Sequence, residues 1–397
     1  MEDSVGKLHN LRYDSVQHNK IVVAHFMRAY LPGTCTFIYQ YLTNIRRYTS
    51  VVLANQREQL DQFPFPHLYT PPLSPFSMFM VRAERRLLHR QRLIEPFFKQ
   101  ALRTSQASLI HAHFGYTGVY ALPLQSASGL PLVTTFYGAD VSSIPRSPQW
   151  HRSYRKLFER GSLFLVEGSH LRDQLIALGC PAEKVKIQRI GVDLTQFSYR
   201  PSPPTNEAIR ILMVGRLTEK KGVEYGIRAF AQVAAKHPKI ELNIIGDGEL
   251  RKKIQQLINR LKHNVRSRIK LLGYVNYAAY AKEANQTHIF MAPSVTAKNG
   301  DSEGGAPTVL IEMQARGLPI LSTQHADIPE VVVDGSSGYL VPERNPVALA
   351  EKLSALLETP EQWDILGQAG RVHVEQNHDI RKLAQELEAK YDQLLVR

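Results

Sequence analysis

The sequence predicts an α/β protein in which two Rossmann-like doubly wound domains face each other across a cleft. In residues 209–357, short apolar strands alternate with helices, which indicates a parallel sheet covered by helices. Residues 21–191 repeat this alternation less regularly. Between the halves, the segment 198–208 contains three prolines among small polar residues and is typical of a linker. A chain of 397 residues is long enough for two domains with full cores.

The first half contains short apolar segments that we interpret as strands of one sheet. They lie at 21–26, 50–54, 108–114, 131–138, 162–168 and 185–191. We assign residues 1–197 to an N-terminal domain and residues 198–208 to the linker.

The second half has the clearer alternation. Strands are expected at 209–215, 240–246, 269–275, 288–294, from Ile320 onward and at 338–341. Helices are expected at 223–235, from Leu250, at 277–284, from Pro307, at 329–333 and at 346–357. We assign residues 209–378 to a C-terminal domain. We expect residues 379–397 to form a last helix that packs back on the N-terminal domain.

Positive charge is concentrated in the first half. Residues 1–200 contain 24 Lys and Arg against 13 Asp and Glu, whereas the remainder contains 25 against 23. An excess confined to one half indicates a basic surface on one domain, for which nucleic acid and anionic lipid are the usual partners.

The segment 80–94, "MVRAERRLLHRQRLI", places charge and apolar character on opposite sides of a helix. The apolar side holds Met80, Val81, Leu87, Leu88 and Ile94. The basic side holds Arg82, Arg85, Arg86, His89, Arg90 and Arg92, while Glu84 and Leu93 fit neither side. A basic amphipathic helix can lie in an anionic lipid interface. Equally, its apolar side can pack on the domain and leave the arginines in water.

The cysteine pattern and the N-terminal segment indicate in which cellular compartment the protein is expected. The first 20 residues are polar, and no apolar run approaches the roughly 20 residues of a membrane span. Cys35 and Cys180 lie far apart, without metal-ligand spacing, which favours a reducing compartment. We expect a monomeric cytoplasmic protein, peripheral on the inner face of the membrane.

Residues 300–323, "GDSEGGAPTVLIEMQARGLPILST", predict a loop, a helix and a strand. Pro307 fits the first position of a helix, and Gly317 fits its left-handed end. The loop at Gly304, Gly305 and Ala306 therefore lies at a helix N-terminus, where free amide groups and the helix dipole favour an anion.

Two glutamates, Glu303 and Glu312, bracket this anion site. A carboxylate beside a phosphate is repulsive, but it can accept hydrogen bonds from vicinal hydroxyls. A phosphate flanked by two diols describes a nucleotide sugar. The simpler interpretation is a capped helix with two solvated glutamates.

Other candidate site residues follow predicted strands, whose carboxyl ends carry the ligands in such folds. Arg216 and Lys221 in "VGRLTEKKG" can clamp a diphosphate, although the phosphate-loop pattern is missing. Val275 and Ser294 also follow strands. Two candidate groups of the first half also lie at or after the ends of predicted strands, namely Gly33 with Thr34, and the "HAHFG" histidines His111 and His113. Of the two histidines, His113 is the better candidate for the cleft. No third residue has a spacing that suggests a metal site.

Taken together, these motifs resemble retaining GT-B glycosyltransferases of family four. The resemblance is carried by "VGRLTEKKG", "GDGEL", "GYV", "PSV" and "SEGGAPTVLIEMQARGLPILSTQHADIPEVVVDGSSGYLVP", and "HAHFG", "TTFYGAD" and "GVDLTQF" extend it into the first half. Within the family, the chain looks like the transferases of exopolysaccharide assembly of colanic-acid and amylovoran type.

The resemblance implies roles for individual residues. Arg216 and Lys221 match the diphosphate-binding pair, Glu312 the ribose-binding glutamate, Glu303 the glutamate that contacts the donor sugar, and His113 a histidine near that sugar. Donor-binding positions would include Val275, Ser294, Gly304, Gly305, Ala306, Pro307 and Thr308, and acceptor-side positions Gly33, Thr34, Tyr137 and Asp140. The family needs no metal, so no cofactor is expected.

Two features depart from the family pattern. Eight residues separate Glu303 from Glu312 instead of seven, and the extra one, a glycine by our interpretation, lies in the loop 303–307. The family often has histidine where this chain has Tyr137, a neutral phenol.

The expected function is transfer of a hexose, with retention, from a nucleotide diphosphate sugar, a UDP-sugar by preference, to a lipid-linked glycan. The acceptor would attack from the donor's own face, so no enzymatic nucleophile is named. One alternative is a nucleotide-sugar epimerase on the same fold. Another is a non-enzymatic nucleic-acid binder, which no recognisable binding motif supports.

Overall fold

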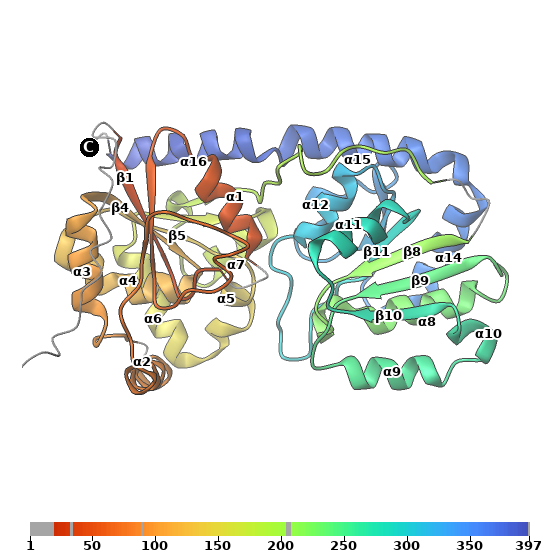
Figure 1. Cartoon of the computed structure of the whole chain (residues 1–397), viewed down its shortest axis with the longest axis horizontal. Helices are drawn as coiled ribbons and strands as arrows, with labels where there is room; N and C mark the ends of the chain where they lie inside the picture. Colours follow the sequence, from red (N-terminus) through yellow and green to blue (C-terminus); the bar gives the residue numbers. More distant parts are fainter. Residues whose placement is uncertain (1–19, 32–34, 89, 204–207, 396–397) are drawn as a thin grey trace, which may run out of the picture.

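The computed structural model describes residues 20–31, 35–88, 90–203 and 208–395. Its helices and strands form two domains, each built on a parallel sheet, that lie side by side (Figure 1). The predicted pair of Rossmann-like doubly wound domains is therefore confirmed. Gly33, Thr34 and part of the expected linker, residues 204–207, lie outside the described residues.

The first sheet has seven parallel strands in the order β3-β2-β1-β4-β5-β6-β7. They are β1 (Val22–Met27), β2 (Thr49–Ala54), β3 (Leu68–Tyr69), β4 (Ala107–His113), β5 (Leu132–Thr135), β6 (Leu163–Val166) and β7 (Val185–Ile187). Every residue of β1 is buried, as expected of a central strand covered on both faces. The strand order reverses between β1 and β4, which is where ligands bind in such sheets.

Seven helices accompany this sheet in the described residues. They are α1 (Thr36–Asn44), α2 (Pro75–Leu88), α3 (Glu95–Thr104), α4 (Gly115–Ser128), α5 (Ala139–Ser142), α6 (Pro148–Arg160) and α7 (Ser169–Ala177).

The second sheet has six parallel strands in the order β10-β9-β8-β11-β12-β13. They are β8 (Ile209–Val214), β9 (Ile240–Ile245), β10 (Ile269–Gly273), β11 (Ile289–Ala292), β12 (Ile320–Thr323) and β13 (Gly338–Val341). The helices of this half are α8 (Val223–Val233), α9 (Arg251–Asn259), α10 (His263–Arg266), α11 (Tyr277–Asn285), α12 (Thr308–Ala315), α13 (Ile328–Val331), α14 (Pro346–Glu358), α15 (Trp363–Asn377) and α16 (Ile380–Leu395).

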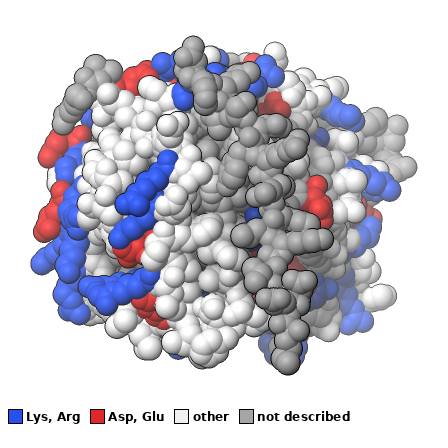
Figure 2. Space-filling view, turned by 60° about the vertical axis from the view of Figure 1, so that its left-hand side comes forward, with Lys and Arg blue, Asp and Glu red and all other residues white. Residues whose placement is uncertain are grey.

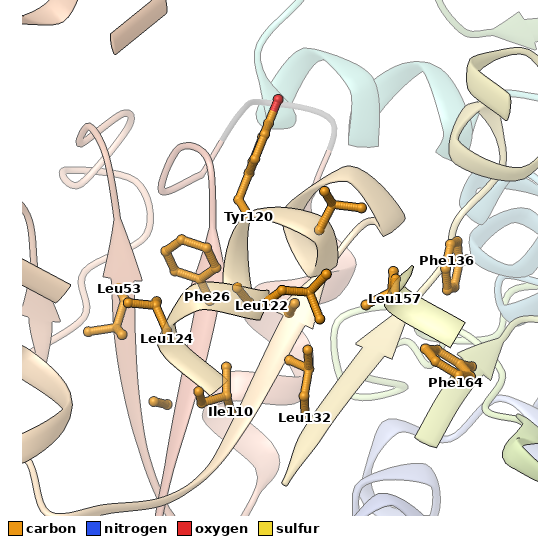
Figure 3. Packing of buried hydrophobic residues seen from close by; sticks show 14 of the residues in the cluster. Phe26, Leu53, Ile110, Tyr120, Leu122, Leu124, Leu132, Phe136, Leu157 and Phe164 are labelled. Carbon is orange, nitrogen blue, oxygen red and sulfur yellow. The ribbon is translucent and has the colours of Figure 1, made fainter. Parts of the chain in front are cut away.

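Aromatic and aliphatic side chains from the sheet, α4 and α6 fill the core of the first domain (Figure 3). Phe26 of β1 meets Phe98 of α3 edge to face, with ring centroids 5.1 Å apart. Leu157 of α6 packs beside Phe136 and Phe164 (Figure 3). Each such buried side chain stabilises the fold by roughly 1.5–3 kcal/mol, so the cleft is built on a rigid support.

Helix α16 returns to the first domain from the end of the second (Figure 1). Its buried positions Ile380, Leu383, Leu387 and Tyr391 recur at helical spacing and face α1 and β4. The Tyr391 hydroxyl lies 2.6 Å from His111 Nδ1, so this helix is anchored in the first domain's core.

Two local predictions were wrong. The segment 80–94 is not one helix, because α2 ends at Leu88 and Ile94 is the N-cap of α3. Of its expected apolar side, only Val81 and Ile94 are buried. Pro307 is the N-cap of α12 rather than its first helical residue, a shift of one position. Gly317 has the expected left-handed backbone, with φ 89°.

Candidate functional site

A cavity of about 490 Å³ lies between the two domains, at the carboxyl ends of their central strands. Nine predicted site residues line it, namely Tyr137, Asp140, Arg216, Lys221, Glu303, Ala306, Pro307, Thr308 and Glu312. The folded chain therefore brings together residues that are up to 175 positions apart, counting from Tyr137 to Glu312.

The turn after β8 positions the two cations. The chain leaves β8, forms a short 3-10 turn at Glu219–Lys221 and enters α8 through Gly222. A Cβ on Gly222 would lie 1.7 Å from the Pro293 carbonyl oxygen, and its φ is +61°, so only glycine fits there. Arg216 is exposed at the cavity wall, and Lys221 points across it toward Glu303.

Glu303 is held inside the cavity by two side chains. Its Oε2 lies 2.9 Å from Lys221 Nζ, and its Oε1 accepts a hydrogen bond of 2.8 Å from Ser294 Oγ. Burial alone would raise the pKa of Glu303, but the charges of Lys221 and Lys220 and these hydrogen bonds outweigh it and lower the pKa. The surroundings of Glu303 therefore favour its ionised form, and the longer loop does not carry it out to solvent.

Buried polar groups also support the loop behind Glu303. The Glu303 amide donates to His325 Nε2 at 3.1 Å, and His325 Nδ1 lies 2.6 Å from Glu343 Oε1. The neighbouring Lys220 is buried and donates to Asp301 Oδ1 and to the Ser302 carbonyl oxygen. Sequence reasoning missed Lys220, although it lies in the same "EKK" turn as Lys221.

Glu312 lies in α12 and faces the same cavity. The Tyr280 hydroxyl donates a short hydrogen bond to Glu312 Oε2. Burial raises the pKa of Glu312, although the bond from Tyr280 and the charge of Arg316 oppose the change. The two glutamates therefore occupy different electrostatic surroundings at opposite ends of the Gly-Gly-Ala-Pro loop.

The first domain contributes a chain of hydrogen-bonded rings. His113 Nδ1 lies 2.7 Å from the Tyr137 hydroxyl, and His113 Nε2 lies 3.0 Å from His25 Nδ1. Burial lowers the pKa of His113, so the ring is neutral. His113 does not line the cavity itself, but it contacts the Tyr137 phenol, which does.

His25 supplies the third histidine that the sequence spacing did not reveal. Nitrogens of His25, His111 and His113 lie within 4.8 Å of one another, which is a possible metal-ligand arrangement. In the part of the chain that the structure describes, however, His25 Nε2 is the one nitrogen of the trio without a hydrogen-bond partner. The arrangement fits a neutral hydrogen-bonded network better than a metal site.

Asp140 lines the cavity, but its carboxylate accepts hydrogen bonds from the backbone amides of Tyr137, Gly138 and Gly115. The other predicted residues that the structure describes lie near the cavity without lining it. Gly304 and Gly305 pack against the first domain, and Ser294 lies behind Glu303. Val275 packs beside the core of the second domain. Lining residues that the sequence did not point to are Cys35, Phe37, Phe114, Tyr116, Ala139, Ile144, Glu167, Ile190, Val214, Gly215, Lys220 and Val309.

Comparison with known proteins identifies the architecture and then the family. HepE of Anabaena, solved with UDP and glucose, superimposes with a TM-score of 0.75 at 18% identity over 93% of this chain and 99% of that one. Sucrose-phosphate synthase of Thermosynechococcus elongatus also gives 0.75, at 18% identity over 95% of this chain and 100% of that one. Two facing Rossmann-like domains with a cleft between them define the class of GT-B proteins.

Sequence comparison gives the family. A model described as group 1 glycosyl transferases matches residues 196–373, and one described as glycosyltransferase family 4 matches residues 38–196. WcaL of Escherichia coli, named for colanic acid biosynthesis, is 34% identical over 286 residues, or 71% of this chain and 70% of the relative. AmsK of Erwinia amylovora, named for amylovoran biosynthesis, is 34% identical over 288 residues with the same coverage. The chain belongs to the group 1, family 4 glycosyltransferases.

Proposed function

We propose that this protein transfers a hexose, with retention of configuration, from a UDP-sugar to a lipid-linked glycan during exopolysaccharide synthesis. The observation that carries the proposal is the convergence of Lys221, Glu303 and Glu312 with the start of α12 on one cavity. Cations and free amides at that helix start suit a diphosphate. The two carboxylates suit the hydroxyls of the ribose and the hexose.

Side chains of this protein can supply each role that the proposed transfer reaction needs. Arg216 and Lys221 would neutralise the diphosphate as it departs, so the proposed reaction relies on protein cations rather than on a resident metal. A diphosphate would compete with Glu303 for Lys221, and Glu303 would then be free to accept a hydrogen bond from the sugar. UDP is favoured among nucleotides because HepE, which shares the fold, was solved with UDP and glucose.

The pathway follows from the relatives. WcaL and AmsK are named for colanic acid and amylovoran biosynthesis, which supports a role in exopolysaccharide synthesis. The lipid-linked acceptor is part of the same proposal and is tested by the assay below.

The decisive experiment is a transfer assay over a panel of nucleotide sugars, with and without a lipid-linked glycan acceptor. We expect UDP release that depends on the acceptor. An epimerase would convert one nucleotide sugar to another and release no nucleotide. Binding that ignores nucleotide sugars and weakens steeply with salt would instead support the nucleic-acid alternative.

The surface of the first domain supports membrane docking. Helix α2 exposes apolar side chains, with Phe76 71%, Phe79 65% and Leu87 69% accessible. Exposed arginines lie on and beside it, at Arg82, Arg86, Arg90 and Arg92, whereas Arg85 is partly buried. Figure 2, which brings the first domain forward, shows Lys and Arg side chains along one edge of a largely uncharged face. In the described ranges, no helix has the length and apolar character needed to cross a bilayer.

We propose that α2 inserts its apolar side into the interface of an anionic membrane while the arginines contact lipid phosphates. Vesicle co-sedimentation tests this. Phe76→Ser with Phe79→Ser should weaken binding to all vesicles, and replacing the four exposed arginines by glutamine should weaken binding to anionic vesicles most. Ile365→Ser, which removes an equally exposed apolar side chain of the second domain (67% accessible), is the matched control. Equal recovery of the parent with neutral and anionic vesicles would refute the docking proposal.

A further inference from the structure

Glu167 directly follows β6 and lines the cavity from the first domain. Its side chain is largely enclosed, with 8% of the residue accessible. A Cβ on Gly305 would lie 1.6 Å from Glu167 Oε2, so the carboxyl rests directly against the loop that carries Glu303. The lack of a side chain at Gly305 therefore makes room for a carboxyl at the junction of the two domains, where donor and acceptor would meet.

The neighbouring carboxylates already have partners, and Glu167 does not. Asp140 and Asp327 accept hydrogen bonds from backbone amides, and Glu303 is held by Lys221 and Ser294. Within the part of the chain that the structure describes, no donor makes a hydrogen bond to the Glu167 carboxyl. An enclosed polar group without a partner costs free energy, and such a group facing a cavity is available to a ligand.

The surroundings of Glu167 raise the affinity of its carboxylate for a proton. Burial, and then the negative charges of Asp327, Asp140 and Glu303, raise its pKa well above the usual range, and Lys220 opposes them. The phenols of Tyr41 and Tyr137 face it as well. Glu303, by contrast, has a lowered pKa. When two carboxyls in one site are shifted in opposite directions, the raised one is suited to exchange a proton and the lowered one stays charged.

No histidine in the cavity wall competes for this role. Both nitrogens of His113 are occupied by His25 and Tyr137, and the ring lies behind the Tyr137 phenol. Burial raises the pKa of Tyr137 well above its usual range, so the phenol keeps its proton.

We propose that Glu167 is the base that takes the proton from the attacking acceptor hydroxyl, an inference that rests on the proposed transfer reaction. As the acceptor oxygen forms its bond to the anomeric carbon, the bond from that carbon to the diphosphate oxygen breaks. The bonding electrons leave with the nucleotide diphosphate, and the hydroxyl proton moves to the Glu167 carboxylate. The proton then passes to solvent through the open cavity.

The test is kcat as a function of pH for the parent, Glu167→Gln, Glu167→Asp and the exposed first-domain control Glu183→Gln. Glu167→Gln should lower kcat by about 100-fold or more, the usual contribution of a general base. Its donor KM should stay within about threefold, because the lost contact is made to the acceptor. The parent's kcat should fall toward acid pH as the carboxylate is protonated, and the glutamine variant should lack this acidic limb. Glu167→Asp should keep the limb at a lower rate, and Glu183→Gln should match the parent.

Two results would overturn the inference while leaving the transferase intact. One is a Glu167→Gln enzyme with parental kcat. The other is a slow Glu167→Gln enzyme that keeps the acidic limb, which would show a positioning role only. If the parent itself transfers no sugar from any nucleotide donor, the proposed function fails first and the inference falls with it. Unchanged melting temperatures of the glutamine variants exclude misfolding as the cause.

Discussion

At the scale of single residues, the two cations of the proposed diphosphate clamp differ in their partners. Lys221 and Glu303 lie 2.9 Å apart, while Arg216 has no ion-pair partner among the described residues. A diphosphate leaving group would draw on both cations as its charge develops. The site therefore holds one cation in position with a carboxylate and leaves a second one exposed at the entrance.

Removing either cation tests this clamp. We expect Lys221→Ala and Arg216→Ala each to lower kcat at saturating donor by roughly 30- to 1,000-fold, the effect of losing about 2–4 kcal/mol of transition-state stabilisation. Arg228→Ala, which removes an exposed arginine of α8 away from the cavity, should leave kcat unchanged. Near-parental turnover of both cavity variants would mean that the clamp is misassigned.

The two glutamates should give different kinetic signatures. Glu312 lies in α12 and is expected to hold the ribose equally in the ground and transition states, so Glu312→Gln should raise donor KM more than it lowers kcat. Glu303 stays ionised beside the proposed sugar position, and it would stabilise the positive charge that develops at the anomeric carbon. Glu303→Gln should therefore lower kcat most. Steady-state kinetics with varied donor separates the two, and parental values for Glu303→Gln would remove its catalytic assignment.

The sequence predicted the site residues that lie in a recognisable local motif, and it missed those whose role depends on contacts with residues far away in the sequence. Glu303 stands in a loop, Lys221 in a turn and Glu312 in the helix after the loop, and the neighbouring glycines and prolines predict this local geometry. Glu167 ends a predicted strand, 162–168, and that position was the available signal. Its distinguishing property is the contact with Gly305, 138 residues later, which no local pattern encodes.

At the scale of elements, the loop before α12 depends on contact between glycines of the two domains. Gly304 has φ +80°, and a Cβ there would lie 2.1 Å from the Gly138 Cα. Gly335 has a similar φ of +75°, but nothing lies within 4 Å of a Cβ at that position. Comparing substitutions at Gly304 and Gly335 therefore separates the effect of backbone strain, which both share, from that of interdomain packing, which only Gly304 has.

Alanine at each position tests this difference. Gly335→Ala should cost about 1 kcal/mol of stability through backbone strain alone and leave transfer intact. Gly304→Ala carries the same backbone strain, and its Cβ must also displace either the Tyr137–Gly138 turn or the loop of residue 304 itself. We therefore expect the kcat/KM of Gly304→Ala to be at least about tenfold lower than that of Gly335→Ala. Denaturant unfolding and kcat/KM measure the two effects. Equal behaviour of the variants would show that the contact does not position Glu303.

The elements predicted for the second half agree with the structure to within about two residues, whereas the predicted strands 131–138 and 185–191 were too long, because β5 ends at Thr135 and β7 at Ile187. Periodicity also failed where an apolar side faces outward. The segment 80–94 was interpreted as one amphipathic helix, but α2 starts earlier, at Pro75, and ends at Leu88. Apolar side chains such as Phe76 remain exposed there. Spacing shows that a helix has two sides, but only the tertiary structure shows which of them is covered.

At the scale of the whole molecule, acidic side chains of the second domain cap a helix of the first. Asp327 Oδ1 accepts from the His170 amide at 2.7 Å, and Glu330 Oε1 accepts from the Ser169 amide at 2.7 Å, both at the start of α7. Arg189 of the first domain pairs with Glu330 at 3.2 Å. The domain count was predictable from the linker and the strand alternation, whereas this interface depends on how the domains meet.

This interface predicts that the stability of the folded protein depends on pH because Asp327 titrates. Burial, and then the charge of Glu330, raise the pKa of Asp327 from 3.8 to about 6, although the amides of His170 and Leu171 oppose the change. A raised pKa means that the folded protein holds this proton more tightly than the unfolded chain. The resulting stabilisation is complete below about pH 3.8 and is lost as the pH rises through about 6, a change on the order of 3 kcal/mol.

Asp327→Asn removes that titration, because the amide is neutral at every pH and its oxygen can still accept from the His170 amide. We expect the variant to gain stability relative to the parent as the pH rises from 5 to 8, by about 1.4 kcal/mol, because roughly half of the ~3 kcal/mol is already lost at pH 5. Thermal melting across this range measures the difference, and Asp61→Asn, an exposed position of the first domain, is the control. The change should be steepest at the acid end of this range, near pH 5, midway between the pKa values of the unfolded and folded states, and should level off above pH 6. A constant difference between Asp327→Asn and the parent from pH 5 to 8 would mean that Asp327 is ionised throughout, and that its charge is stabilised by the start of α7 as fully as it would be in water.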